Sequence, residues 1–275
     1  MTTELLNEAG APYAPASGTL ALLADALDAL AARHYDAEHH RMDYGAAAVS
    51  AEFRDLQQAT GQLSGTDPGE LDSVRARVAF WLNVYNALTL HVVLAHRVHD
   101  TLQDVPDVFT GPRYRVGGHD VTLDVVEHGI LRRNARKYLG VSGILDRRDA
   151  RSAWMPARIE PSLHFGLYTA CMSSPVLQAF RVDSVRGQLA QSARAYLDAT
   201  IRIDDAGGTI LVPRLFKWYA ADFGGRDEPI LAFVAEHLPH DARHRHIDAN
   251  GSRLDLVHDA YDWRINDRYA ITDMG

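Results

Sequence analysis

Hydrophobic positions recur at helical spacing near the start of the chain. In 18–33, leucines three or four residues apart lie on one helix face, and a second helix is expected over 46–59. The stretch 70–96 differs because it is apolar on nearly every face, which is typical of a helix buried on all sides. The pattern therefore predicts a long central helix, which we expect Asp72 or Ser73 to open.

Shorter apolar runs bounded by turn residues predict strands in the rest of the chain. These runs are 114–116, 120–122, 163–168 and 209–212. Further helices are expected after Asp124, from Ser174 and Pro175, over 183–198, and from Pro213 and Pro229. The expected fold is α+β: a helix-rich single domain over 70–275, in which the long helix packs on a small, mainly antiparallel sheet. Residues 1–69 form an N-terminal helical extension in this interpretation.

Composition narrows the class of protein. The net charge of −8 argues against nucleic-acid binding, which needs a basic surface. The longest apolar runs, such as 78–82, are far shorter than the roughly 20 residues that span a bilayer, so no membrane partner is expected. The chain has one cysteine and starts without a signal-peptide pattern, which favours a cytoplasmic location. Neither a phosphate-binding loop nor a metal-ligand spacing is present, so neither a cofactor nor a metal is expected.

The single cysteine, Cys171, follows the apolar run 163–168 and precedes Ser174 and Pro175. A thiol in a turn before a helix is near unpaired amide groups and the positive end of the helix dipole, which favour the thiolate. His164, seven residues upstream, can serve as its base. The alternative interpretation is that Cys171 is a small buried hydrophobe and His164 a hydrogen-bonded core histidine.

Four further polar residues lie on predicted helices. Asn83 and Asn86 are three apart on the central helix and can either bind a substrate carbonyl or bridge buried elements. Glu127 and His128 are adjacent, about 100° apart on a helix, so both cannot point straight into one site. We expect Glu127 to face the site, with a pKa raised by burial.

Other candidate contacts to a substrate surround these groups. Lys217 and Tyr219 can bind an anion or donate to an oxyanion, but at most one is expected to face the site because they are two apart on a helix. Thr169, Ser173 and Ser174 flank Cys171 and are also expected to bind substrate.

Five blocks of the sequence, in order, resemble the domain-of-unknown-function family numbered 547. The blocks are Phe80–Leu88, Leu123–Arg132, Leu163–Leu167, Leu215–Tyr219 with Asp222 and Phe223, and Tyr261–Trp263 with Asn266. The resemblance covers roughly 72–267 and implies a distant relationship to the papain and transglutaminase group, in which cysteine, histidine and a carboxylate or amide converge in a cleft. Family members usually carry cysteines where this chain has Thr169 and Ser174. The nucleophile has therefore either moved to Cys171 or been lost.

The leading hypothesis is a cysteine-dependent acyl-transfer enzyme, a hydrolase or acyltransferase acting on a small-molecule or peptide thioester, ester or amide. Cys171 would attack the carbonyl, His164 would relay the proton and Glu127 would support the imidazole, with backbone amides from Met172 to Ser174 stabilising the oxyanion. Specialised biosynthesis is a setting that fits such a protein. One alternative is a non-covalent acid–base cyclase, lyase or isomerase that uses His164 and Glu127. The other is a non-catalytic binding module.

Overall fold

The computed structural model describes residues 4–7, 10–137, 143–204, 206 and 208–269. The α-helices are α1 (Ala16–His34), α2 (Tyr44–Ala47), α3 (Ala51–Gly61), α4 (Val74–His96), α5 (Val185–Thr200), α6 (Leu215–Trp218), α7 (Asp227–His237) and α8 (Ala242–Asn250). The strands are β1 (Tyr35–Asp36), β2 (Arg41–Met42), β3 (Arg113–Val116), β4 (His119–Thr122), β5 (Arg202–Ile203), β6 (Thr209–Val212) and β7 (Asp255–His258). A π-helix, η4 (Val125–Leu131), and short 3-10 helices complete the chain: η1 (Gln62–Gly65), η2 (Pro68–Glu70), η3 (Leu102–Asp104), η5 (Ala150–Trp154), η6 (Pro161–Phe165), η7 (Ala220–Phe223) and η8 (Gly251–Arg253).

The predicted central helix is confirmed as α4. It begins after Ser73, whose hydroxyl accepts a hydrogen bond from the amide of Ala76 at 3.0 Å, as expected of an N-cap. Every residue from Val78 to Leu94 is buried. The helix is long and apolar enough to cross a membrane, but 94% of its most apolar window is buried inside the protein, so it is a core helix here. It packs mainly against α1 and η4, and also against α2, α3 and α5.

The strands form three small sheets, and the α+β class is confirmed. The hairpin of β3 and β4 and the strand β6 lie where the sequence predicts them. Strand β6 pairs with β5 in antiparallel and with β7 in parallel orientation.

The predicted strand at 163–168 is wrong, because this segment is the 3-10 helix η6 followed by an irregular turn. Asn86 accepts a hydrogen bond from the amide of Tyr168 at 2.9 Å and donates to the carbonyl of Gly166 at 3.1 Å. A side chain of α4 thus supplies partners that a sheet ladder would supply, so the buried segment needs no neighbouring strand.

The helix predicted from Ser174 and Pro175 is also wrong, since the chain continues there without regular structure to Arg181. Asn83 explains the difference. It accepts from the amide of Phe180 at 2.8 Å and donates to the carbonyl of the same residue at 2.9 Å. The two asparagines therefore bridge buried elements, which was one of the two roles considered for them.

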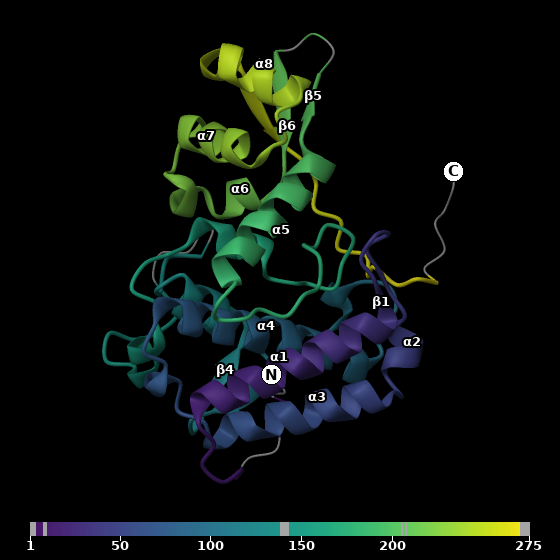
Figure 1. Ribbon diagram of the computed structural model, residues 1–275, viewed down its shortest axis with the longest axis vertical. Helices are drawn as coiled ribbons and strands as arrows, with labels where there is room; N and C mark the ends of the chain where they lie inside the picture. The colour runs from purple at the N-terminus through teal and green to yellow at the C-terminus, as the bar shows by residue number, and fades with distance from the viewer. Residues whose placement is uncertain (1–3, 8–9, 138–142, 205, 207, 270–275) are drawn as a thin grey trace.

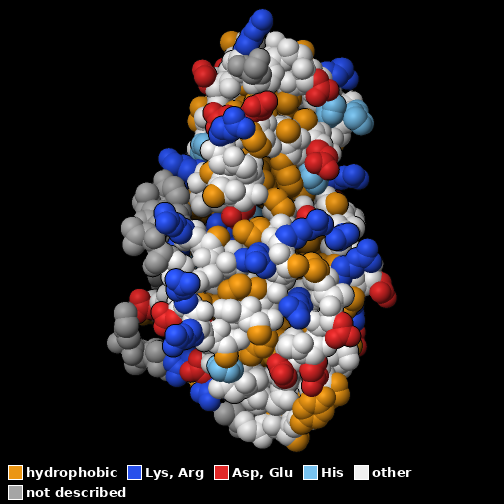
Figure 2. All heavy atoms as spheres, turned by 90° about the vertical axis from the view of Figure 1, so that its left-hand side faces the viewer, with side chains coloured by type: hydrophobic (Ala, Val, Ile, Leu, Met, Phe, Trp, Pro, Cys, Tyr) orange, Lys and Arg blue, Asp and Glu red, His pale blue; other side chains and the backbone are white. Residues whose placement is uncertain are grey.

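The buried hydrophobic side chains divide into two clusters. The larger contains α1, α3 and α4 and continues to Leu189 on α5, so the N-terminal extension shares a core with the central helix. The smaller lies between α5, β6, α6 and α7 in the C-terminal part. Figure 1 shows the first region below and the second above, with α5 reaching between them. On the face shown in Figure 2, acidic, basic and hydrophobic side chains are mixed over both regions.

After β7 the chain returns from the upper to the lower region as an extended segment, residues 259–268, which we call the C-terminal strap (Figure 1). Isolated bridges join Arg264 to Thr101, Ile265 to Cys171, and Asp267 to Met42. The strap therefore lies against three segments that are far apart in the sequence.

Candidate active site

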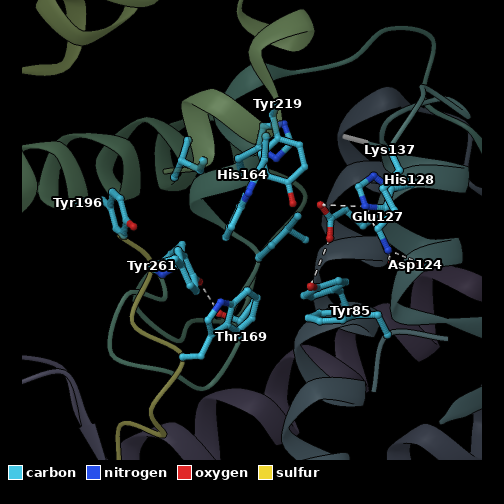
Figure 3. A pocket seen from close by; sticks show the side chains of 16 residues that line it. Tyr85, Asp124, Glu127, His128, Lys137, His164, Thr169, Tyr196, Tyr219 and Tyr261 are labelled. Atoms are coloured by element: carbon cyan, nitrogen blue, oxygen red, sulfur yellow. Dashed lines mark hydrogen bonds and ion pairs between the residues drawn. The ribbon is translucent and has the colours of Figure 1, made fainter. Parts of the chain in front are cut away.

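A cavity of about 270 Å³ lies where α4, η4, η6, α6 and the C-terminal strap meet. One part of its lining, which we call the polar cluster, consists of Asp124, Glu127, His128, Lys137 and His164. Another part, the aromatic cluster, consists of Phe109, Trp218, Tyr261 and Trp263. Figure 3 shows Glu127, His128 and Tyr85 on one side of the cavity, Thr169 and Tyr261 on the other, and His164 with Tyr219 between them. Mixed polar and aromatic lining of this kind is typical of a small-molecule site.

His164 lies on η6 and belongs to a buried charge network. Its Nε2 atom is 2.9 Å from a carboxylate oxygen of Asp222, which also pairs with the guanidinium of Arg132 through contacts of 2.5 and 3.0 Å. All three side chains are at most 2% exposed. Burial favours the neutral acid, but the hydrogen bonds from His164 and Arg132 outweigh it and lower the pKa of Asp222 to about 2. Asp222 is therefore ionised at neutral pH.

This arrangement defines the state of the His164 ring. Because the carboxylate can only accept, the proton of neutral His164 lies on Nε2, and Nδ1 keeps a lone pair. Within the described part of the chain, Nδ1 has no hydrogen-bond partner. Burial lowers the pKa of His164 in spite of the opposing effect of Asp222, so the ring is mostly neutral at pH 7. Tyr219 stacks on it with ring centres 3.9 Å apart. The His164 imidazole is thus held in a fixed orientation, and its Nδ1 is a buried basic nitrogen without a hydrogen-bond partner among the described residues.

Glu127 lies on the π-helix η4 and is 4% exposed. The hydroxyl of Tyr85 donates to Oε2 at 3.3 Å, whereas Oε1 has no hydrogen-bond partner among the described residues. Burial alone would raise the pKa of Glu127, but His128, Tyr219 and neighbouring positive charges lower it below its usual value. The expectation of a raised pKa is therefore wrong, and the carboxylate is ionised.

His128 lies in the cavity lining together with Glu127, and it is equally buried. The wider turn of a π-helix changes the angle between adjacent side chains, so the straight-helix argument for choosing one of them does not apply. Arg132 donates to Nδ1 of His128 at 2.6 Å, which leaves Nε2 as the protonated nitrogen. That atom is 3.8 Å from Glu127 and 3.9 Å from Asp124. Burial lowers the pKa of His128, so it is mostly neutral at pH 7.

Thr169 lies at the cavity surface, whereas Cys171 lies behind it. Cys171 is fully buried, and among the described residues that line the cavity Thr169 is present and Cys171 is not. The Cys171 sulfur is 3.1 Å from the Thr169 hydroxyl and 3.6 Å from the Tyr261 hydroxyl, and the two hydroxyls are 2.7 Å apart. Burial raises the pKa of the thiol. Ala170 turns the chain between them, with a φ of 56°. The cavity therefore presents a hydroxyl with a thiol behind it.

Of the other residues predicted to contact the substrate, some line the cavity and others hold neighbouring segments in place. The amides of Met172, Ser173 and Ser174 already donate to the carbonyls of Arg264, Asp262 and Cys171, so they are not free to bind an oxyanion. The Ser173 and Ser174 hydroxyls accept from the amides of Asp262 and Thr169, both at 2.9 Å. Tyr219 lines the cavity and Lys217 is exposed, which agrees with the expectation that at most one of them faces the site.

Sequence reasoning missed Asp222, Arg132 and the aromatic cluster. Asp222 is 58 residues from His164, and Arg132 is 90 residues from Asp222, so no local spacing connects them. The signal that could have found all of them except Phe109 was their place in the blocks that carry the family resemblance. Over the residues that the structure describes, no group of three or more histidine, cysteine or acidic side chains is arranged to hold a metal ion.

Comparison with known proteins adds a family match. The model of the family described as "Protein of unknown function, DUF547" matches residues 70–197. This range includes α4, η4, η6 and most of α5, and therefore the whole polar cluster. Asp222, Trp218 and the C-terminal strap lie outside it. No curated protein and no solved structure shows significant similarity to the chain.

Proposed function

We propose that this chain, of which residues 70–197 belong to the DUF547 family, is an enzyme that moves protons on a small molecule bound in the cavity. The observation that carries the proposal is the His164 ring. It lines the cavity, is anchored through Nε2 to an ionised carboxylate, and keeps an unpaired Nδ1. A histidine oriented in this way has the tautomer and the basicity that a general base needs.

The chemistry follows from the charges around that ring. When Nδ1 takes a proton from the substrate, the positive charge on the imidazole is stabilised by Asp222. The hydroxyls of Tyr85 and Tyr219 stay protonated because burial raises the pKa of both, and both interact with Glu127. The Nε2–H of neutral His128, which is 3.8 Å from Glu127 and 3.9 Å from Asp124, is the donor left for the substrate. Proton removal at one atom with hydrogen bonding at another fits a cyclisation, elimination or isomerisation. The proposed class is therefore a non-covalent cyclase, lyase or isomerase.

The position of Cys171 supports this choice over covalent acyl transfer. A nucleophilic thiol needs access to the substrate and a depressed pKa. The Cys171 thiol is fully buried behind Thr169, and its pKa is raised. The relationship to papain-like enzymes stays a prediction.

The proposal can be tested by untargeted mass spectrometry of a cellular small-molecule extract incubated with purified protein. We expect the wild type and Cys171→Ala to convert the same compound. His164→Asn should lose about 10²-fold to 10⁴-fold of the rate, the usual contribution of a general base. His99→Asn, an exposed histidine, is the matched control. Circular dichroism would check that every variant is folded.

Three results would contradict the proposal. Loss of turnover in Cys171→Ala, with an acyl adduct on the wild-type protein, would establish the covalent mechanism. Absence of any conversion by the wild type would favour a binding module. His164→Asn acting as fast as the wild type would remove the proposed base.

A further inference from the structure

The charges that face the cavity do not cancel. Lys137 pairs with Asp124 through contacts of 2.7 and 3.0 Å, and Arg132 pairs with Asp222. His128 and His164 are mostly neutral at pH 7. Glu127 is therefore a buried carboxylate without a positively charged partner among the described residues. The His128 ring is 3.8 Å away and neutral. The described residues of the cavity lining therefore carry an unbalanced negative charge.

The unpaired atom of that carboxylate marks where a ligand would bind. Oε2 of Glu127 accepts from Tyr85. The Tyr219 hydroxyl also interacts with the carboxylate, but Oε1 makes no hydrogen bond of regular geometry within the described residues, and His128 at 3.8 Å is too far for one. A buried acceptor without a partner is costly, and a charged one more so. A ligand that brings a cationic N–H donor would satisfy both the charge and the hydrogen bond.

The aromatic cluster indicates the other half of the ligand. Tyr261 and Trp263 have ring centres 4.6 Å apart, and Trp218 lies 5.0 Å from Tyr261 and 5.9 Å from Trp263. Phe109 extends this surface, 5.9 Å from Trp263. Such rings favour stacking with a flat apolar group, and their faces also attract a cation. The volume of about 270 Å³ limits the ligand to a small molecule.

We propose that the ligand of this cavity is a small aromatic amine, whose ring packs on Phe109, Trp218, Tyr261 and Trp263 and whose ammonium group binds Glu127. The inference rests on the proposed function only in taking this cavity as the substrate site. It assigns Glu127 to substrate recognition and leaves the proton transfer to His164. The amine would thereby be held at a fixed place in the cavity, across from Thr169 and Tyr261 (Figure 3).

Isothermal titration calorimetry with three ligands of one shape tests this assignment: 2-phenylethylamine, 2-phenylethanol and 3-phenylpropanoate. They share a phenyl ring and a two-carbon linker and differ in charge. We expect the amine to bind at least about tenfold more tightly than the carboxylate, which would place a second negative charge beside Glu127. The alcohol should lie between them.

Variants separate the two halves of the site. Glu127→Gln, which keeps the size of the side chain, should weaken the amine about tenfold and change the alcohol by less than about threefold. Trp263→Leu should weaken all three ligands by a similar factor. Glu236→Gln on α7, an exposed carboxylate outside the cavity, should change none of the affinities.

Equal affinity for the three ligands, no detectable binding of the amine, or an unchanged amine affinity in Glu127→Gln would overturn the assignment. Circular dichroism would show whether each variant is folded. Because binding is measured without turnover, such a result would leave the His164 proposal standing. Conversely, amine binding by a protein without activity would overturn the enzyme and keep the ligand class.

Discussion

The polar and aromatic clusters line the same cavity but are held in different ways. Four members of the polar cluster are at most 7% exposed, and their side chains are fixed by ion pairs or hydrogen bonds. The aromatic cluster is only partly buried, and it is organised mainly by ring contacts between Trp218, Tyr261 and Trp263. Rigid polar groups suit proton transfer, which needs fixed geometry, whereas weakly held rings can adapt to a ligand.

The clusters also differ in their place along the chain. The whole polar cluster lies inside the range of the family match, whereas Trp218, Tyr261 and Trp263 lie beyond it. The groups proposed to move protons and most of the groups proposed to contact the ring of the ligand therefore come from separate parts of the sequence. Asp222 is the exception, because it lies outside the match and anchors His164.

The largest effect is expected from breaking the anchor of the polar cluster. Asp222→Ala would leave the Arg132 guanidinium, 1% exposed, without its carboxylate. Removing one partner of a buried pair costs about 3 to 5 kcal/mol of unfolding free energy. Urea unfolding measures this loss, with the exposed Asp72→Ala as the control, expected within about 0.5 kcal/mol. A loss below about 1 kcal/mol in Asp222→Ala would show that the network contributes little.

The next-largest effect is expected in the pH dependence of the unfolding free energy. His91 serves as the reference because it is a buried histidine of α4 that does not line the cavity. Burial lowers its pKa to about 4. Between that value and the unfolded value of about 6.5, the unfolded state binds more protons, so stability falls as pH falls. The slope from one such histidine is at most about 1.4 kcal/mol per pH unit.

Urea unfolding between pH 7 and pH 4 would measure the slope in the wild type, His91→Phe and His164→Phe. Each variant should show a shallower slope than the wild type, because the pKa of each histidine is lowered in the folded protein. Stability that rises as the pH falls below 6.5 would contradict the inferred neutral state of these rings.

A third experiment moves the thiol from the buried position 171 to position 169 in the cavity lining. In Thr169→Cys with Cys171→Ala, the thiol would lie in the cavity lining instead of behind it. We expect iodoacetamide to alkylate this thiol at least about tenfold faster than Cys171 of the wild type, because reactivity follows exposure and pKa. Intact-mass spectrometry over time gives both rates. Equally fast alkylation of the wild type would show that Cys171 is reachable.

The smallest effect is expected in the aromatic cluster. Trp218→Leu removes ring contacts from a partly exposed side chain and should cost about 1 kcal/mol of stability. The adjacent Lys217→Ala, on an exposed side chain, should stay within about 0.5 kcal/mol. Thermal unfolding compares the two. A loss for Trp218→Leu as large as that for Asp222→Ala would mean that the aromatic cluster is as structural as the polar one.

Local pattern predicted the elements that local interactions stabilise. The central helix and its Ser73 cap, the hairpin of β3 and β4, and the strand β6 all appear where expected. The segments 163–168 and 175–180 were predicted wrongly because their backbone groups are paired with Asn83 and Asn86, about eighty to one hundred residues earlier in the chain. A side chain that replaces a sheet neighbour or a helical turn leaves no periodic signal.

Residue identity and order were enough to predict the helix-rich α+β class, the buried α4 and the similarity to the DUF547 family that the match over residues 70–197 supports. They also singled out His164 and Glu127, which line one cavity. They could not show which carboxylate orients His164, because Asp222 reaches it through folding across 58 residues. Nor could they show that Thr169 rather than Cys171 faces the cavity. That choice depends on the turn at Ala170 and on the strap that pairs with Cys171, and both follow from long-range packing.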